Sequence, residues 1–231
     1  MHTIVLHSVD STNTYAKRLL QEGGYDLPLC VAALQQTAGK GRYSREWSSL
    51  PGGVYFSIAQ KISGNTKENA AYPLYIASIV HHWLKTTLRI SDLFIKWPND
   101  MYINMRKLSG ILSTMQTCGS ESIIITGVGI NVRNDIPDTA VSLRQLFPEK
   151  TFNIHTILHD IVQEIHTHSF DHEQVRTYIN SYLWGKNQTR KLIIHGEEIK
   201  GIIREVADDF SLVLERDDDK KLCRYSLGEL E

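Results

Sequence analysis

Apolar side chains recur in short runs along the first 186 residues. Many of these runs are rich in β-branched and aromatic side chains, which predicts strands. They cover residues 3–9, 30–36, 54–60, 93–97, 101–103, 107–116 and 123–132. The last four follow one another through short turns, as neighbouring strands of an antiparallel sheet do.

Other segments repeat apolar side chains every three or four residues, which predicts amphipathic helices. The first helix begins after Ser11 and Thr12, which are good N-cap residues, and ends at Gly23. Further helices are expected at residues 69–88, 142–147, 154–170 and 173–184. Helices that interrupt a mainly antiparallel sheet predict an α+β fold rather than repeated βαβ units.

The pattern changes after Lys186. Brief polar turns separate short strands at residues 190–194, 198–206, 211–215 and 222–226. Such spacing predicts a small antiparallel β-barrel. We therefore expect two domains, a larger one over residues 1–186 and a small C-terminal barrel over residues 187–231.

Composition narrows the possible functions. The 25 Lys and Arg residues balance 26 Asp and Glu residues, which argues against a general nucleic-acid-binding surface. The three cysteines are scattered and form no CxxC, so neither a disulfide framework nor a zinc site is expected. The first residues show no signal-peptide pattern and no apolar run reaches about 18 residues, so neither a signal peptide nor a membrane span is expected. We expect a cytoplasmic protein that binds neither DNA nor membranes.

One polar stretch, QTAGKGRYSREW at residues 36–47, lacks apolar periodicity and is predicted to be a loop. Gly39 and Gly41 would let the backbone approach a ligand closely. Three cations in the stretch can neutralise phosphate charge: Lys40, Arg42 and Arg45. The loop alone fits a phosphate-binding lid and a solvated basic hairpin equally well. It matches neither the Walker A motif nor the dinucleotide-binding fingerprint.

Three further stretches stand out. They are STN at residues 11–13, KWPND at 96–100 followed by KLSGIL at 107–112, and GVGIN at 127–131. In order and spacing, the four stretches resemble the biotin protein ligases, and the resemblance runs from about Ser8 to Glu231. The lysine seven residues after KWPND and the segment GVGINV are its most specific features.

This resemblance implies a fold and a reaction. The fold is a mainly antiparallel mixed sheet flanked by helices, of the class II aminoacyl-tRNA synthetase and biotin–lipoate ligase type, with a small C-terminal SH3-like barrel. The reaction joins biotin and ATP into biotinyl-5'-AMP and releases pyrophosphate. A lysine of a biotin carboxyl carrier domain then attacks the mixed anhydride. Biotin, ATP and Mg²⁺ would be co-substrates, and no permanent cofactor is implied.

The resemblance also implies roles for single residues. Lys107, Arg42 and Arg45 would be catalytic, because the carboxylate of biotin and the α-phosphate repel each other unless cations lie between them. Biotin would be bound by Ser11, Thr12, Asn13, Gln36, Gly39, Lys40, Gly41, Arg42, Lys107, Gly110 and Gly127. ATP and the adenylate would be bound by Arg42, Arg45, Trp47, Asn99, Asp100, Lys107 and Asn131. Trp47 would cover the adenine, and Asp100 would be a ligand of Mg²⁺.

The loop departs from the family pattern, which commonly reads GRGRRGR-x-W. Lys40 keeps a charge but lacks the guanidinium fork. Tyr43 and Ser44 replace a basic residue and a glycine, which bears on how the loop flexes and closes. The chain begins at the first expected strand of the catalytic domain, so we expect the monofunctional type without an N-terminal DNA-binding domain.

Two alternatives remain open. A lipoate–protein ligase would use the same chemistry on another acid, although the forms of KWPND and GVGINV favour biotin. A non-catalytic biotin-responsive binding protein is the other alternative. The presence of Arg42, Arg45 and Lys107 argues against it, because a protein without activity has no need for these cations.

Overall fold

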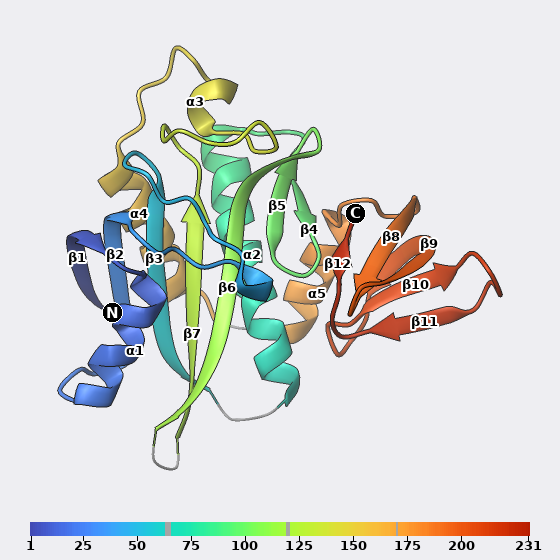
Figure 1. Ribbon diagram of the computed structural model, residues 1–231, viewed down its shortest axis with the longest axis horizontal. Helices are drawn as coiled ribbons and strands as arrows, with labels where there is room; N and C mark the ends of the chain where they lie inside the picture. Colours follow the sequence, from blue (N-terminus) through green and yellow to red (C-terminus); the bar gives the residue numbers. More distant parts are fainter. Residues whose placement is uncertain (63–65, 119–120, 170) are drawn as a thin grey trace.

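The computed structural model describes residues 1–62, 66–118, 121–169 and 171–231. Within these residues, a seven-stranded sheet runs in the order β1-β2-β3-β7-β6-β5-β4 (Figure 1). The strands are β1 (His2–Val9), β2 (Leu29–Gln36), β3 (Val54–Ile62), β4 (Phe94–Lys96), β5 (Asp100–Ile103), β6 (Arg106–Cys118) and β7 (Glu121–Ile130). β1 and β2 are parallel and the other neighbours are antiparallel. The prediction of a mainly antiparallel mixed sheet is confirmed.

Helices lie on both faces of this sheet (Figure 1). Helix α1 (Thr12–Glu22) contacts β2, β3 and β7 on one face, here called the front face. Helices α2 (Thr66–Leu88), α4 (Ile154–Thr167) and α5 (His172–Ser181) pack together on the rear face. The short helix α3 (Leu143–Leu146) begins with a capping box formed by Ser142 and Gln145.

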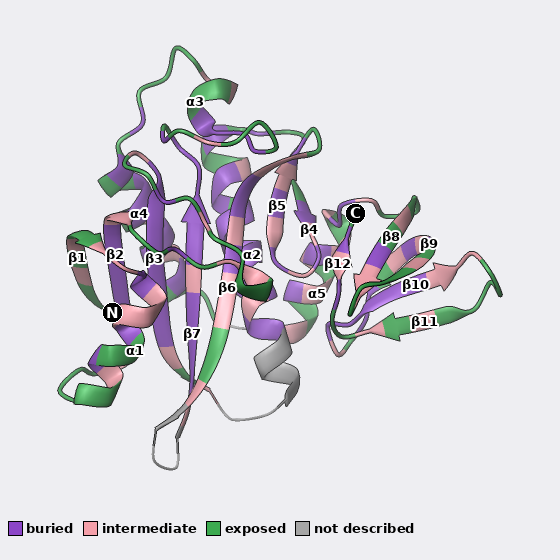
Figure 2. Cartoon of the chain, viewed as in Figure 1, coloured by how far each residue is buried: buried purple, intermediate pink, exposed green. Residues whose placement is uncertain are grey.

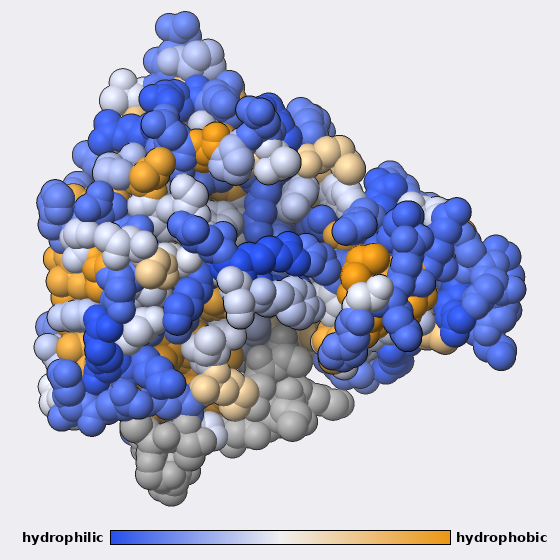
Figure 3. All heavy atoms as spheres, viewed as in Figure 1, coloured by the Kyte–Doolittle hydropathy of each residue, from blue (hydrophilic) through white to orange (hydrophobic). Residues whose placement is uncertain are grey.

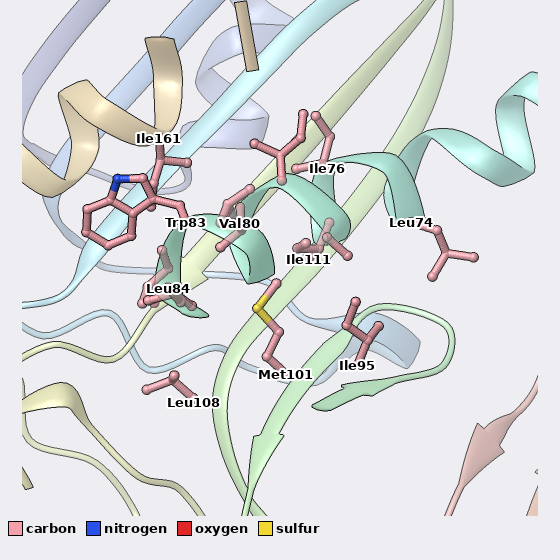
Figure 4. Packing of buried hydrophobic residues seen from close by; sticks show 14 of the residues in the cluster. Leu74, Ile76, Val80, Trp83, Leu84, Ile95, Met101, Leu108, Ile111 and Ile161 are labelled. Atoms are coloured by element: carbon pink, nitrogen blue, oxygen red, sulfur yellow. The ribbon is translucent and has the colours of Figure 1, made fainter. Parts of the chain in front are cut away.

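Two apolar cores follow from this layering (Figure 2). The larger core lies behind the sheet, where Val80 and Leu84 of α2 approach Met101 and Leu108 of the strands (Figure 4). The smaller core joins α1 to Leu29 and its neighbours on the front face. Because both faces of β2 are covered, this strand reads as a continuous apolar run instead of alternating.

Helix α5 is shorter than the periodicity predicts. It ends at Ser181, whereas residues 173–184 were expected to be helical. The reason is a competing set of hydrogen bonds. Ile95 donates its amide to Tyr182 O (2.8 Å) and accepts at its carbonyl from the amide of Trp184 (2.9 Å). Tertiary pairing with β4 therefore removes residues 182–184 from the helix.

The C-terminal part forms a second, smaller antiparallel sheet, in the order β11-β10-β9-β8-β12. Its strands are β8 (Thr189–Ile194), β9 (Glu197–Val206), β10 (Leu212–Arg216), β11 (Leu222–Tyr225) and β12 (Glu229–Leu230). The sequence predicts a small SH3-like barrel here. Over residues 187–231, all described, no pairing joins the edge strands β11 and β12, so the strand pairs define an open sheet.

The C-terminal sheet is tied to the larger part of the protein at the turn after β4 and at helix α5. The Trp97 indole Nε1 donates to Phe210 O of the C-terminal part (3.1 Å), and Asn180 Nδ2 donates to Val206 O (2.9 Å). Figure 1 shows β12 returning beside β4 and β5. Among the described helices, none is long and apolar enough to span a membrane.

Candidate active site

A pocket opens on the front face of the large sheet, where α1 covers only part of β3, β7 and β6. Residues 36–47 cross this opening, and β12 of the C-terminal sheet closes one end (Figure 1). Fourteen residues of the predicted site line the pocket: Ser11, Thr12, Asn13, Gln36, Lys40, Gly41, Arg42, Arg45, Trp47, Asn99, Asp100, Lys107, Gly110 and Gly127. The structure thus brings together segments that lie far apart in the sequence.

Two predicted residues, Gly39 and Asn131, do not line the pocket. A Cβ on Gly39 would lie 2.5 Å from the carbonyl oxygen of Trp47. Glycine at this position therefore lets the two ends of the loop pack closely against each other. The Asn131 side chain is buried and donates to Lys107 O (3.3 Å). Its contact supports the backbone of Lys107 from behind.

One end of the pocket is a network of uncharged polar groups. Gln36 Oε1 accepts from the amide of Thr12 (2.8 Å) and from its hydroxyl (3.1 Å). The Thr12 and Ser57 hydroxyls share a hydrogen bond of 2.8 Å, and Asn13 Nδ2 donates to Ile125 O (3.2 Å). Ser11 caps α1 by accepting from the amide of Thr14. The hydroxyls and amides of this end are therefore positioned by helix and strand backbone.

The loop itself is folded back on its own backbone. Gly41 donates its amide to Arg45 O (2.7 Å), and Trp47 donates its amide to Gly39 O (2.9 Å). Between these bonds, Tyr43 and Ser44 both have positive φ, at 54° and 59°. L-residues rarely adopt this conformation, and glycine adopts it without penalty. Ser44 thus adopts, at a cost, a backbone conformation that suits glycine.

Glycines form the floor of the pocket beneath Trp47. A Cβ on Gly129 would lie 2.4 Å from Trp47 Nε1, and a Cβ on Gly110 would lie 2.9 Å from Trp47 Cζ3. The indole therefore lies directly on the backbone of β6 and β7. Lys107 Nζ lies 5.1 Å from the ring centroid, within range of a cation–π contact. Trp47 Nε1 is buried and has no hydrogen-bond partner among the described residues.

An ion pair lies at the centre of the pocket. Lys107 Nζ is 2.7 Å from Asp100 Oδ2, and both side chains remain partly exposed, at 29% and 20%. Asp100 and Lys107 lie on adjacent strands, β5 and β6, on either side of a register shift. The second oxygen, Asp100 Oδ1, is buried and accepts no hydrogen bond from the described residues. Its lone pairs are therefore available to a ligand.

The two loop arginines reach the C-terminal sheet. Arg42 Nη2 donates to Gly228 O (3.0 Å), and Arg45 forms a two-bond ion pair with Glu229. The pKa of the Glu229 carboxyl is lowered, first by its hydrogen bond with Arg45 and also by Lys96 and Arg42. Figure 3 shows hydrophilic side chains spanning the space between the two sheets. The loop is thus bridged to β12 by charge and by hydrogen bonds.

Several lining residues were not predicted, among them Ser57, Lys96 and Glu229. Ser57 is a fully buried polar residue in the first half of β3, and the alternation of that strand alone does not show which face holds the pocket. Lys96 is the last residue of β4, next to the buried Ile95, and burial lowers the pKa of Lys96. Glu229 gave no local signal, because only the pairing of β12 with β8 brings it to the pocket.

The chain was compared with known proteins. Residues 5–131 match the model of the biotin/lipoate A/B protein ligase family. The bifunctional ligase/repressor BirA of Escherichia coli is 30% identical over 227 residues, which are 92% of this chain and 69% of that protein. The biotin–[acetyl-CoA-carboxylase] ligase of Paracoccus denitrificans is 30% identical over 132 residues, which are 55% of this chain and 53% of that protein.

A solved structure has the same fold. The biotin protein ligase of Aquifex aeolicus in complex with biotin and ATP superposes with a TM-score of 0.81, over 100% of this chain and 97% of that one, at 24% identity. The matched family model covers more than half of the chain and includes the pocket's helix, loop and central strands. The chain therefore belongs to the biotin/lipoate A/B protein ligase family.

Proposed function

We propose that this protein is a biotin–protein ligase, which activates biotin with ATP to biotinyl-5'-AMP and then transfers biotin to a lysine of a carrier domain. The observation that supports it most is the shape of one pocket with two chemically different ends. An uncharged hydrogen-bonding end adjoins Thr12 and Gln36, and a cationic end contains Lys107 and the loop arginines. The Paracoccus denitrificans relative named above carries a biotin ligase activity in its name.

The uncharged end would bind the ureido ring of biotin. That ring offers two N–H donors and one carbonyl acceptor, and it needs hydroxyl and amide partners of both kinds. Thr12, Ser57, Asn13 and Gln36 carry such groups within one cluster. The apolar chain of biotin would then extend from this end toward Lys107, and Trp47 would leave the glycine floor that its indole now covers.

The cationic end would bring two anions together. The biotin carboxylate must attack the α-phosphate, and repulsion between them raises the barrier unless preorganised cations offset it. Lys107 would lie between carboxylate and α-phosphate, with Arg42 opposite it, and Arg45 would contact the departing pyrophosphate. Lys107 would exchange its contact with Asp100 for contacts with substrate oxygens.

Asp100 fits the Mg²⁺ that accompanies ATP. One of its oxygens is buried without a donor, which suits a hard cation with a preference for oxygen. In the described part of the chain no group of three or more His, Cys, Asp or Glu side chains is arranged to hold a metal by itself. Mg²⁺ would therefore arrive with ATP, coordinated by phosphate oxygens, water and Asp100.

Lipoate is the alternative acid, because the family includes lipoate ligases. Its dithiolane ring can neither donate nor strongly accept hydrogen bonds, so it would leave the polar groups near Thr12 without partners. Sites built to hydrogen-bond a substrate reject analogues that lack those groups by large factors, up to about 10⁴–10⁵. We therefore favour biotin.

The test is pyrophosphate release by the purified protein with ATP and Mg²⁺, with biotin or lipoate as the acid. Biotin-dependent release, followed by labelling of a carrier-domain lysine, is the expected result. Faster turnover with lipoate would make the protein a lipoate ligase. Binding of biotin without adenylate formation would make it a non-catalytic binding protein.

A further inference from the structure

Lys107 lies at a point of the large sheet that the neighbouring strand does not reach. β7 ends at Ile130, before it comes level with Lys107. Residues 139–141 take its place: the amide of Lys107 donates to Thr139 O (3.2 Å), and its carbonyl accepts from the amide of Val141 (2.9 Å). A loop segment, rather than a strand, therefore holds the backbone of this lysine.

Two asparagines hold the same carbonyl from the end of β7. Asn131 Nδ2 donates to Lys107 O (3.3 Å), and Asn131 Oδ1 accepts from Asn134 Nδ2 (3.2 Å). Asn134 Oδ1 in turn accepts from the amide of Val132 (3.0 Å). Both asparagines are buried, and neither lines the pocket. Their side chains form a short chain of hydrogen bonds that ends on the backbone of Lys107.

The direction of this chain depends on Asn134. A side-chain amide carries an oxygen and a nitrogen of similar size, and its neighbours decide which of the two faces a given partner. Asn131 faces a carbonyl oxygen at Lys107, so it presents its nitrogen there. Asn134 secures that orientation, because it offers a donor that only the oxygen of Asn131 can accept. The opposite orientation would set two oxygens against each other at Lys107 and two nitrogens against each other at Asn134.

We propose that Asn134 is a positioning residue for Lys107. It acts through Asn131 on the Lys107 backbone, and so sets the direction in which the ammonium group enters the pocket beside Asp100. Displacing a reacting or stabilising group by about 1 Å can cost roughly 10²-fold in rate. This inference rests on the proposed function, because it takes Lys107 to act on the reaction of biotin with ATP.

A purely structural role is the competing explanation. Asn134 also donates to Asp135 O (3.4 Å), and the neighbouring Arg133 donates its amide to Gly52 O (2.9 Å). On this view, Asn134 only stabilises the segment that follows β7. Its loss would then lower the unfolding temperature and would change the reaction rate by the same factor with or without the Lys107 side chain.

Asn134→Asp separates the two roles, since it keeps the shape of the side chain and the acceptor for Val132 but replaces the donor with a second acceptor. We expect single-turnover adenylate formation at saturating biotin and ATP to fall about tenfold. In a Lys107→Ala background the same substitution should change the rate less than twofold, because no ammonium group is left to position. Biotin affinity without ATP should stay within twofold, because the uncharged end is unaltered.

Asn180→Asp is the matched control. Asn180 also bonds main chain through both atoms of its amide, as a donor to Val206 O (2.9 Å) and as an acceptor from the Val206 amide (2.8 Å), and it is not a pocket residue. This variant should unfold at a lower temperature than the wild type and keep the adenylation rate within twofold.

The position of Lys107 can also be measured without substrate. NMR signals of the lysine ammonium groups, assigned with Lys107→Ala, report whether Lys107 still pairs with Asp100. Asn134→Asp should weaken this ion pair, and so should Asn134→Ala, which removes the donor without adding a charge. A wild-type protein that forms no adenylate would refute the proposed function, while the NMR comparison would still decide whether Asn134 positions Lys107.

Four results would overturn the proposal. They are an unchanged adenylation rate in Asn134→Asp, an equal loss of rate with and without the Lys107 side chain, an unaltered ion pair between Lys107 and Asp100 in both Asn134 variants, and failure of both variants to fold. The last result would make Asn134 a structural residue only.

Discussion

The two ends of the pocket are built differently. At the uncharged end, Thr12, Ser57 and Gln36 hydrogen-bond one another and are carried by a helix start and two strands. At the charged end, Arg42 and Arg45 sit on a loop, and their present partners are Gly228 and Glu229 of another sheet. The first end is preformed for a neutral ring, while the second must exchange protein partners for phosphate.

The strongest test of the charged end is Lys107→Ala. We expect adenylate formation to fall about 10³-fold, because one preorganised group aimed at the reacting charges contributes roughly 10²–10³ in rate. The protein should remain folded, because the Lys107 side chain is partly exposed. Single-turnover adenylation measures the effect. Arg106→Ala is the control, since Arg106 is the preceding residue of the same strand and does not line the pocket. Equal rates in both variants would remove Lys107 from the mechanism.

The second prediction concerns the support behind the charged end. His81 is fully buried, donates from Nε2 to Leu93 O (2.9 Å) just before β4, and accepts at Nδ1 from the Tyr178 hydroxyl (2.8 Å). Burial lowers the pKa of His81 to about 4 from 6.5. Between pH 4 and pH 6.5, His81 therefore binds a proton in the unfolded chain but stays neutral in the folded protein. The pKa difference of His81 thus contributes about 3 kcal/mol to the free energy of unfolding above pH 6.5, and this contribution is lost as the pH falls toward 4.

Urea unfolding at pH 7 and at pH 4.5 measures this loss. His81→Gln is the informative variant, because its amide can still donate to Leu93 O but does not titrate. The variant should lose less stability than the wild type over the same pH interval. An identical loss in both proteins would show that other groups cause the acid sensitivity.

The third prediction tests the uncharged end. Thr12→Val keeps the shape of the side chain and removes a hydroxyl that joins Gln36 and Ser57. Biotin affinity should fall about 10- to 100-fold, since leaving buried polar groups unpaired costs about 1–3 kcal/mol. ATP affinity, measured without biotin, should not change. Thr14→Val, two residues further along α1 and outside the pocket lining, is the control. A matching loss of ATP affinity would break the division into two ends.

The sequence predicted the two ends unequally well. Fourteen of the predicted site residues line the pocket, because family motifs mark positions even where the local pattern is ambiguous. Glu229 escaped notice, because a two-residue strand carries no periodicity and reaches the pocket only by pairing with β8. Ser57 escaped notice for a different reason. Alternation in β3 shows that two faces exist, but only the packing of α1 and α2 decides which face holds the pocket.

The sequence predicted that glycines would lie in the site, but not which neighbour each glycine would accommodate. Gly110 and Gly127 line the pocket, and Gly110 lies against the Trp47 and Lys107 side chains. Gly39 instead accommodates the backbone of Trp47, and Gly129, which was not among the predicted site residues, accommodates its indole. A sequence shows that a position lacks a Cβ, but not which neighbour needs the space. The expected barrel illustrates the same limit, because closure depends on the pairing of edge strands far apart in the chain.

The smallest expected effect concerns the loop that joins the two ends. Ser44 has φ of 59°, where a side chain costs about 1 kcal/mol relative to glycine. Ser44→Gly relieves this strain but gives the unfolded chain more freedom, so the net gain in stability should be below about 1 kcal/mol. Ser44→Ala, which keeps the Cβ and loses the hydroxyl, should not gain. Thermal unfolding of both variants measures the difference. If glycine destabilises the protein more than alanine does, the loop geometry does not strain Ser44; if Ser44→Gly alters biotin affinity as much as ATP affinity, the loop serves both ends equally.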